Sequence, residues 1–366
     1  MKLQVSTAKF QEMLGKASRG ASNNKLVPIT TFVAIDCKGD TLTLTTTDGT
    51  NYLYVKEPIT NADGDFYVCI ETDILVKLVS KFTSDTITFE LLDNYLNVTA
   101  NGNYKLPITN DESTGKAIVI KNPINDSDLK KVGSISLVSV KTILNGLRSS
   151  VATSTIVPCY VHYYFGEQVI GTDRVTASYY AKKVFTDNTA RLVNVNMVNL
   201  LDVMTADTID IFANDTQIKF STDNCQIYGT MPQGVEDWNV EALLTLSNRE
   251  FDNSCSVDRA TLQSALDRIN LFVDKFDDGE IILTFDDKDM TISSRLSTGV
   301  ENIPYIESYL QSSMDGENIT MSINIKTLAS RIHSFMSDTV KIEFGATNVI
   351  KLVDTDVITV IALIDD

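Results

Sequence analysis

The segment Asp85-Thr86-Ile87-Thr88-Phe89 has two close copies further along the chain. The copies are Asp207-Thr208-Ile209-Asp210-Ile211 and Asp338-Thr339-Val340-Lys341-Ile342. They are spaced by about one-third of the chain, and a regular spacing of similar segments indicates internal repeats. In each copy apolar and polar residues alternate, as in a half-buried strand. The sequence therefore predicts three repeats of one unit.

Each of these strands follows a segment in which apolar residues recur three and four positions apart, the period of an amphipathic helix. These segments are residues 72–82, 196–204 and 325–336. Further alternating runs follow each strand, as in residues 95–100 and 104–108. Each repeat is therefore predicted to end with a helix and three strands.

The first half of each repeat shows the same order, with helices expected at residues 7–17, 139–149 and 258–272. We therefore predict an α+β fold in which each repeat contains the β-α-β-β-β unit twice. Antiparallel sheets are expected on one side of each repeat and two helices on the other. Repeats of this kind can close into a ring, which leaves few sheet edges unpaired. The expected domains are residues 1–125, 126–248 and 249–366.

The composition is that of an ordinary globular protein, since 43% of the 366 residues are apolar and 22% are charged. We find neither a run of about 18 apolar residues nor the apolar segment of a signal peptide near Met1, so a cytoplasmic protein without membrane contact is expected. The cysteines show no metal-ligand spacing and are expected to be reduced core residues. They are Cys37, Cys69, Cys159, Cys225 and Cys255.

Positive charge is concentrated on the expected helices, although the chain carries 31 basic and 48 acidic residues and a net charge of −17. The helical segments and their ends hold eleven basic and only five acidic side chains. The basic ones are Lys9, Lys16, Arg19, Lys77, Lys81, Lys141, Arg148, Arg259, Arg268, Lys326 and Arg331. Such a surface can contact DNA phosphates without reading bases. The pattern favours loose, non-specific binding of duplex DNA.

Several segments of the chain resemble the beta sliding clamp of bacterial DNA polymerase III. They are Met1-Lys2-Leu3-Gln4-Val5, Val27-Pro28-Ile29, Leu42 to Asp48, Gln168-Val169-Ile170-Gly171-Thr172-Asp173 and Gly234-Val235-Glu236-Asp237-Trp238. The likeness covers nearly the whole chain. It implies a head-to-tail homodimer that encircles double-stranded DNA and tethers the polymerase as a processivity factor. It also implies that the chain is not an enzyme and uses no cofactor or metal.

The resemblance implies three sets of site residues. DNA is expected to meet the helical cations named above except Arg259, together with Lys25. A partner-peptide cleft for polymerase and clamp loader is expected at Val157, Thr172, Arg174, Val175, Thr176, Ala177, Leu243, Val360, Ile361, Ala362, Leu363 and Ile364. The dimer interface is expected at Tyr104, Leu106, Ile108, Leu271 and Phe272.

The cleft departs from the usual family pattern. Typical members carry Thr-Asp-Gly-His-Arg-Leu where this chain has Thr172-Asp173-Arg174-Val175-Thr176-Ala177, and they end near Met-Pro-Met-Arg-Leu where this chain has Ile361-Ala362-Leu363-Ile364. The divergence is that of a phage, plasmid or remote clamp with its own peptide specificity. A phage-encoded clamp would act in the host cytoplasm.

Two other classes of protein fit the sequence less well. An enzyme is disfavoured because the chain has two histidines, His162 and His333, and none of the common catalytic motifs. The acidic runs at residues 274–280 and 286–289 lack the spacing of a calcium-binding loop. The remaining alternative is an acidic repeat scaffold or DNA mimic. A clamp and a DNA mimic are distinguished by whether positive charge gathers on the helices of the folded protein.

Overall fold

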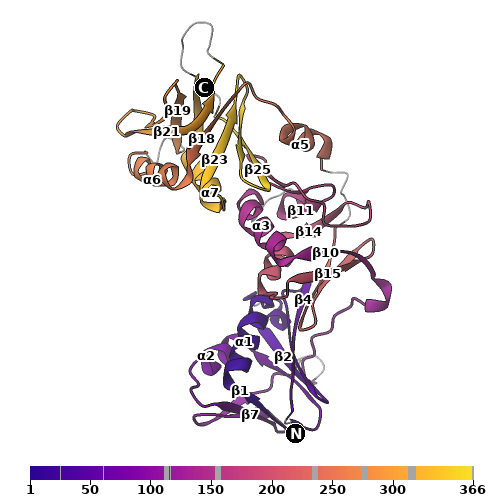
Figure 1. The fold of residues 1–366 in the computed structure, drawn as a ribbon. Coiled ribbons are helices and arrows are strands. Elements are labelled where there is room, and N and C mark those ends of the chain that lie inside the picture. Colours follow the sequence, from indigo (N-terminus) through magenta and orange to yellow (C-terminus); the bar gives the residue numbers. More distant parts are fainter. Residues whose placement is uncertain are drawn as a thin grey trace. The chain divides into compact units, whose positions relative to one another are not determined.

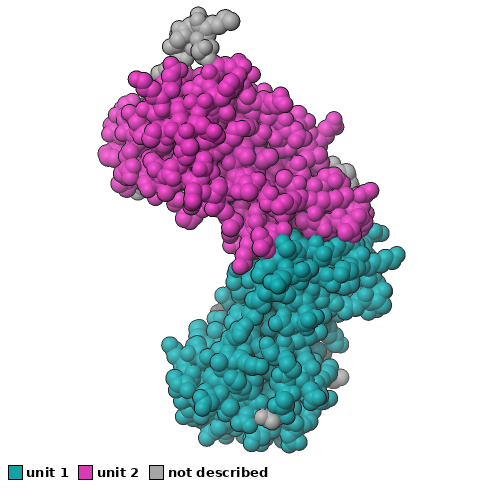
Figure 2. All heavy atoms as spheres, viewed as in Figure 1, with its two compact units in different colours: residues 1–137, 196–232 teal, residues 138–195, 233–366 magenta. Residues whose placement is uncertain are grey.

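A computed structural model describes residues 1–24, 26–60, 62–110, 115, 117–152, 158–232, 238–273, 279–311 and 319–364. The fold is α+β with antiparallel sheets, as predicted (Figure 1). The chain divides into two compact units, which Figure 2 shows in different colours. Unit 1 comprises residues 1–137 and 196–232, and unit 2 comprises residues 138–195 and 233–366.

The helices and strands follow the predicted order, in which a strand, a helix and three strands repeat six times along the chain. The first two rounds are β1 (Lys2–Ser6), α1 (Thr7–Ala17), β2 (Phe32–Lys38), β3 (Thr41–Thr47), β4 (Asn51–Pro58), then β6 (Phe66–Glu71), α2 (Thr72–Val79), β7 (Thr86–Leu91), β8 (Tyr95–Thr99) and β9 (Asn103–Pro107). The next two are β10 (Lys130–Ser136), α3 (Leu137–Leu147), β11 (His162–Phe165), β12 (Val169–Thr172), β13 (Thr176–Tyr180), then β14 (Arg191–Asn194), α4 (Val195–Leu200), β15 (Thr208–Ala213), β16 (Gln217–Ser221) and β17 (Cys225–Thr230).

The last two rounds are β18 (Asn253–Asp258), α6 (Arg259–Ile269), β19 (Glu280–Phe285), β20 (Asp289–Ser294), β21 (Val300–Tyr309), then β22 (Ile319–Asn324), α7 (Ile325–Ser334), β23 (Thr339–Phe344), β24 (Val349–Val353) and β25 (Val357–Ala362). The short strand β5 (Ala62–Asp63) and helix α5 (Val240–Ser247) stand outside this pattern. Short 3-10 turns add η1 (Ser18–Gly20), η2 (Pro28–Thr31), η3 (Asp126–Asp128), η4 (Arg148–Ser150), η5 (Pro158–Val161) and η6 (Leu201–Val203).

Unit 1 contains two of the sheets formed by the described strands. One has the order β5-β1-β7-β8-β9 and the other the order β10-β15-β16-β17-β4-β3-β2-β6. Helices α1 and α2 contact each other (Figure 1). The apolar face of α1 is buried because Phe10, Met13 and Leu14 recur at helical spacing. The Phe10 ring lies 4.7 Å from the ring of Phe89 on β7, so the repeated Asp-Thr strand forms part of the core.

Unit 2 contains a third sheet with the order β14-β11-β12-β13-β25-β24-β23-β18-β21-β20-β19-β22. Helices α6 and α7 contact each other, and their apolar faces enter one buried cluster that also includes Phe285 and Phe344. A second cluster gathers Trp238, residues of β12 and β13, and Val360. The partly buried Leu243 and Leu244 of α5 pack against it. This second cluster lies beside the pocket described below.

Two of the sheets cross the boundaries that the sequence predicted between domains. Strand β4 pairs with β17, and β13 pairs with β25, each in antiparallel register. The compact units therefore do not end at residues 125 and 248, because strands on either side of those positions belong to one hydrogen-bonded sheet. The division into domains 1–125, 126–248 and 249–366 remains a prediction.

Candidate functional site

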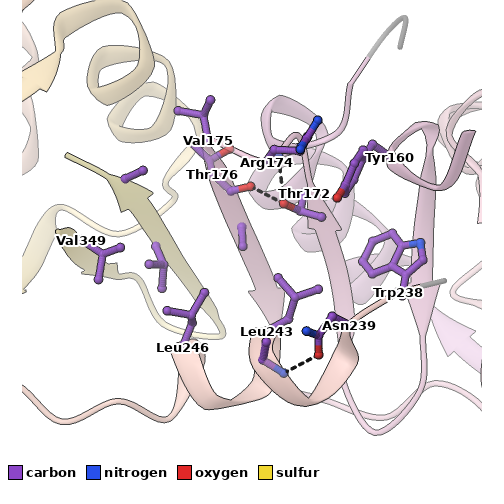
Figure 3. A pocket seen from close by; sticks show the side chains of 14 residues that line it. Tyr160, Thr172, Arg174, Val175, Thr176, Trp238, Asn239, Leu243, Leu246 and Val349 are labelled. Atoms are coloured by element: carbon purple, nitrogen blue, oxygen red, sulfur yellow. Dashed lines mark hydrogen bonds between the residues drawn. The ribbon is translucent and has the colours of Figure 1, made fainter. Parts of the chain in front are cut away.

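An apolar pocket of about 320 Å³ opens in unit 2 (Figure 3). Its walls come from the turn between β12 and β13, from helix α5 and from strands β24 and β25. The lining residues are Tyr160, Thr172, Arg174, Val175, Thr176, Ala177, Trp238, Asn239, Ala242, Leu243, Leu246, Val349, Val360 and Ala362. Ligand pockets in proteins have volumes of this order and are lined mainly by apolar side chains with a few polar groups. The pocket is therefore a candidate binding site.

The β12–β13 turn is held by its own side chains. The Thr172 hydroxyl donates to the Thr176 carbonyl at 2.7 Å. Asp173 Oδ1 accepts hydrogen bonds from the backbone N–H groups of Val175 and Thr176, at 3.0 and 2.7 Å. Because these bonds close the turn, its exposed residues are presented to the pocket in a fixed conformation.

Arg174 sits in this turn with a φ of 81°. Residues other than glycine adopt this left-handed backbone conformation at a cost of roughly 1–3 kcal/mol. The turn between β3 and β4 has the same hydrogen bonds, with Asp48 Oδ1 accepting from the N–H groups of Thr50 and Asn51. There the matching position is Gly49, with a φ of 99°. The second turn thus keeps an arginine where the backbone favours glycine.

Helix α5 forms the wall opposite the turn. The Asn239 side chain begins the helix by accepting a hydrogen bond from the Ala242 N–H at 3.2 Å. The Tyr179 hydroxyl of β13 donates to the Leu243 carbonyl at 2.8 Å and so attaches the helix to the sheet. The Trp238 indole stacks on the Tyr164 ring with 5.9 Å between ring centroids. Aromatic packing thus fixes one end of the wall.

Most of the expected cleft residues line this pocket. They are Thr172, Arg174, Val175, Thr176, Ala177, Leu243, Val360 and Ala362. Three do not line it. Ile361 points into the core on the opposite face of β25, because successive side chains of a strand alternate. Leu363 packs against the same core, and Ile364 donates its N–H to the Ser322 carbonyl at 2.9 Å. Val157 lies outside the described residues.

Six lining residues were missed by the sequence analysis. They are Tyr160, Trp238, Asn239, Ala242, Leu246 and Val349. Four of them belong to α5 or directly precede it, in a segment where the sequence predicted no helix. The signal for this helix was present, since Asn239 is a preferred helix-capping residue and apolar side chains follow at helical spacing.

The expected DNA-contacting cations mostly lie exposed on helices or at helix ends. Lys9, Lys81, Lys141 and Lys326 are exposed and make no salt bridge with any described residue. Others are paired with acidic side chains: Lys16 with Glu12, Arg19 with Asp202, Lys77 with Asp73 and Arg268 with Glu301. Arg148 is exposed in the turn η4 after α3. Lys25 lies outside the described residues.

Arg331 corrects this set, because its side chain is buried with an exposed fraction of 2%. Its Nη2 donates to the Thr176 hydroxyl at 2.7 Å and lies 3.5 Å from the Asp173 carboxylate. Burial lowers the pKa of Arg331 to about 10, against the opposing effect of Asp173. The guanidinium remains a cation at neutral pH but cannot reach a DNA phosphate. Helical periodicity alone did not reveal that the β12–β13 turn covers it.

The expected interface residues lie near two sheet edges. Tyr104 is exposed on the edge strand β9, whereas Leu106 of the same strand is 6% exposed and belongs to the core. Ile108 follows β9 and is half-buried. Leu271 and Phe272 follow α6 with exposed fractions of 80% and 54%. The Phe272 ring lies so close to Gly299 that a Cβ there would come within 2.9 Å of it, which places Phe272 beside the start of β21.

The residues that an enzyme or metal site would need are dispersed. His162 is buried in β11, and the His333 Nδ1 lies 2.7 Å from Gln263 Nε2. Cys37, Cys69, Cys225 and Cys255 are buried free thiols. Among the described residues no three His, Cys, Asp or Glu side chains are grouped to hold a metal ion. Asp274, Asp277 and Asp278 lie outside the described residues. Asp286 accepts the backbone N–H groups of Lys288 and Asp289.

A search for membrane-spanning helices found none in the part of the chain that the structure describes.

Comparisons with known proteins match both ends of the chain and its fold. Residues 1–113 match the N-terminal domain family of the DNA polymerase III beta subunit, and residues 246–364 match its C-terminal domain family. No curated protein sequence matches the chain significantly. Together the two domain matches cover more than half of the chain.

Solved structures of the same kind superimpose over the full length. The DNA polymerase III subunit beta of Borrelia burgdorferi, in complex with a natural product, aligns with a TM-score of 0.87 at 20% identity, covering 100% of this chain and 99% of that one. The beta chain from Streptococcus pneumoniae aligns at 0.83 and 18%, covering both chains completely. The sliding clamp of Bacillus subtilis aligns at 0.82 and 14%, covering 100% and 99%.

The six-fold strand-helix-strand order, the sheets that join neighbouring repeats and the two domain matches point to one family, whose members are non-enzymatic factors that bind DNA and polymerase. The chain belongs to the DNA polymerase III beta subunits, the sliding clamps that serve as processivity factors in DNA replication.

Proposed function

We propose that two copies of this chain join head to tail around duplex DNA, and that polymerase and clamp loader dock by short peptide segments in the pocket between α5 and β25. The chain itself would catalyse no reaction and would act in the cytoplasm, of a bacterium or of a phage host. The pocket is the observation that carries the docking proposal, because a preformed apolar cavity is what a peptide with apolar side chains needs.

Support for the head-to-tail dimer comes from the way strands pair across the chain. The final strands of the fourth and sixth rounds, β17 and β25, pair with the final strands of the first and third rounds, β4 and β13. The final strands of the other two rounds, the second and the fifth, are β9 and β21. Strand β9 is an edge strand, and residues 300–304 of β21 pair only with β20 among the described strands. Pairing β9 of one copy with β21 of another would repeat the arrangement a third time.

The side chains beside these edges fit such an interface. Leu271, Phe272 and Val300 are exposed apolar residues near the start of β21. Tyr104 is exposed on β9 and contacts Phe82 with 5.4 Å between ring centroids. Exposed apolar groups beside an unpaired strand edge are a liability for a protein that stays monomeric. Their burial in a dimer would remove it.

Support for the DNA contacts comes from the distribution of charge. Exposed lysines occur on α1, α2, α3 and α7, although the whole chain carries −17. Arg331 is excluded from this set because it is buried. Contacts through flexible lysines to phosphates are salt-sensitive and carry no sequence information. They suit a protein that must slide.

The experiment that tests the proposal is topological. The protein is loaded onto a nicked circular plasmid with an ATP-supplemented cell extract, and the complex is isolated by gel filtration. A ring stays with circular DNA and leaves when a restriction enzyme linearises it. Equal retention on circular and linear DNA would contradict encirclement. The mass in solution is measured in parallel, since the ring needs two copies.

Docking is tested separately by adding the polymerase. The Leu243→Asp variant should still be retained on circular DNA but should no longer lengthen the products of primer extension. Leu243 is half-buried in the pocket wall. A carboxylate there would lose water when an apolar peptide binds, which weakens the binding. If a folded Leu243→Asp protein supports extension as well as the unchanged protein, the pocket is not the docking site.

A further inference from the structure

Arg174 is the one charged side chain among the described residues that line the pocket. Figure 3 shows Arg174 and Tyr160 on one side of the pocket and Val349 and Leu246 on the other. An occupant that fills the cavity therefore meets aliphatic side chains at one side and a guanidinium at the other. This arrangement differs from a uniformly apolar groove.

In the part of the chain that the structure describes, the Arg174 guanidinium is held in place without an acidic partner. It lies over the Tyr160 ring, with 5.7 Å between Arg174 Cζ and the ring centroid, a cation–π distance. The structure gives Arg174 no salt bridge to any described acidic residue. Other arginines here bind groups of the protein itself. Arg268 pairs with Glu301, Arg191 pairs with Asp187, and Arg331 donates a hydrogen bond to Thr176. The fork of donors on Arg174 is thus open to a ligand.

The backbone supports a functional role for this side chain. Arg174 occupies a left-handed position at a φ of 81°, whereas the equivalent turn at Gly49 uses glycine. An arginine at such a position is disfavoured on conformational grounds alone. Strained residues that persist in folded proteins concentrate at binding sites. The turn therefore retains an unfavourable residue at the point where it faces the pocket.

We propose that Arg174 makes the pocket selective for peptide segments that carry a glutamate or aspartate side chain beside their apolar anchor. The inference rests on the proposed docking of peptides in this pocket. A planar guanidinium binds a carboxylate through two parallel hydrogen bonds. A single guanidinium matches the single charge of a carboxylate, whereas phosphopeptide sites usually present clusters of arginines. A side-chain carboxylate also allows the segment to continue across the pocket.

The test uses defined peptides and fluorescence anisotropy. The probes are labelled, C-terminally amidated heptapeptides with two adjacent central leucines, in which one flanking position at a time is Glu, Gln or Lys. One further peptide has only neutral flanks and a free C-terminal carboxylate. At the position that faces Arg174, the Glu peptide should bind about fivefold more tightly than the Gln peptide. The difference should shrink in high salt because added ions screen the pair.

Two variants assign the effect to Arg174. Arg174→Gln should bring the affinity ratio of the Glu and Gln peptides to about one, while the Gln peptide binds as before. Arg249→Gln is the matched control, because Arg249 is exposed directly after α5 but does not line the pocket. It should keep the preference for Glu.

The remaining outcomes overturn the inference in different ways. If Glu and Gln peptides bind equally well to the unchanged protein, Arg174 is not selective, although the pocket still binds peptides. If only the peptide with a free C-terminus is preferred, the ligand is a terminal carboxylate and the proposed side chain is wrong. If no peptide binds the unchanged protein at any flank, and Leu243→Asp leaves primer extension intact, the docking proposal itself fails.

Discussion

The Arg331 guanidinium of α7 donates a 2.7 Å hydrogen bond to the Thr176 hydroxyl, so the turn that forms one wall of the pocket rests on a buried cation. Asp173 of the same turn lies 3.5 Å from that guanidinium and is itself partly exposed. Arg331 Nε and Nη1 have no hydrogen-bond partner among the described residues. Burying these donors opposes folding, so the cation supports the turn at a net cost in stability.

The Arg331→Met variant should therefore leave the free energy of unfolding within about 1 kcal/mol of the original, because methionine fills the space without a buried charge. Arg331→Ala should lower it by about 2–4 kcal/mol by leaving a cavity. Thermal melts and urea titrations measure both. Retention of Arg331→Met on circular DNA should be unchanged. A loss of retention in this folded variant would show that Arg331 does reach DNA.

Replacing Ala362 by aspartate should affect peptide binding, whereas replacing Leu363 by aspartate should affect stability. Ala362 lines the pocket, so Ala362→Asp should weaken peptide binding at least tenfold with little change in melting temperature. Leu363 packs against the core beneath β25, so Leu363→Asp should destabilise unit 2 by about 2–5 kcal/mol. Anisotropy and calorimetry separate the two effects. A stable Leu363→Asp protein that has lost peptide binding would reverse the assignment of these neighbours.

The Leu271→Asp and Phe272→Asp double variant should convert the proposed dimer to monomers, because it places carboxylates on two exposed apolar residues beside the start of β21. Sedimentation measures the mass over a range of protein concentrations. Val138→Asp is the control, since Val138 is similarly exposed on α3 but far from either strand edge in sequence. Leu106 is unsuitable for this test because it is a core residue. A dimer that survives the double variant would exclude this interface.

Replacing Lys77, Lys81 and Lys141 by glutamine should shorten retention on circular DNA and leave the mass and peptide affinity unchanged. Each phosphate contact that is lost should reduce the log–log slope of affinity against salt by about 0.9. Lys38→Gln is the control, because Lys38 is exposed at the end of strand β2. The helical assignment is wrong if the triple variant is retained normally and Lys38→Gln is not.

Asp354 should stabilise the fold in a pH-dependent way. Its buried carboxylate accepts the backbone N–H groups of Met336 and Ser337, at 2.9 and 3.2 Å. Burial acts to raise the pKa of Asp354, but hydrogen bonds from Ser337 and neighbouring N–H groups outweigh it and hold the pKa below its usual value of 3.8. The stabilisation is therefore full above that value and is lost as the pH falls through the lower, folded-state pKa.

The Asp354→Asn variant should accordingly lose about 1–3 kcal/mol at pH 7 and differ less from the original near pH 3. Urea titrations at the two pH values measure this. Asp338→Asn, with an exposed side chain, should change little at either pH. An Asp354→Asn deficit that is as large at pH 3 as at pH 7 would mean that the charge of the carboxylate is not the source of stability.

The sequence predicted the repeated order of elements because the Asp-Thr strands and the helices before them each show a clear period. It missed α5, a short helix that stands outside the repeated pattern. It placed Arg331 on the DNA surface because helical spacing cannot reveal that a turn from another part of the chain covers that face. Ile361 and Leu363 were assigned to the cleft as part of one stretch, whereas strand alternation and core packing remove them from it.

The pairing of β13 with β25 has a consequence for how the protein is made. Translation produces β13 long before β25, with all of the strands from β14 to β24 in between. Until β25 emerges, the edge of the nearly fully buried strand β13 is open to other chains, a state prone to misassembly. Nascent chains stalled between the two strands should therefore depend on chaperones more than those stalled after β25.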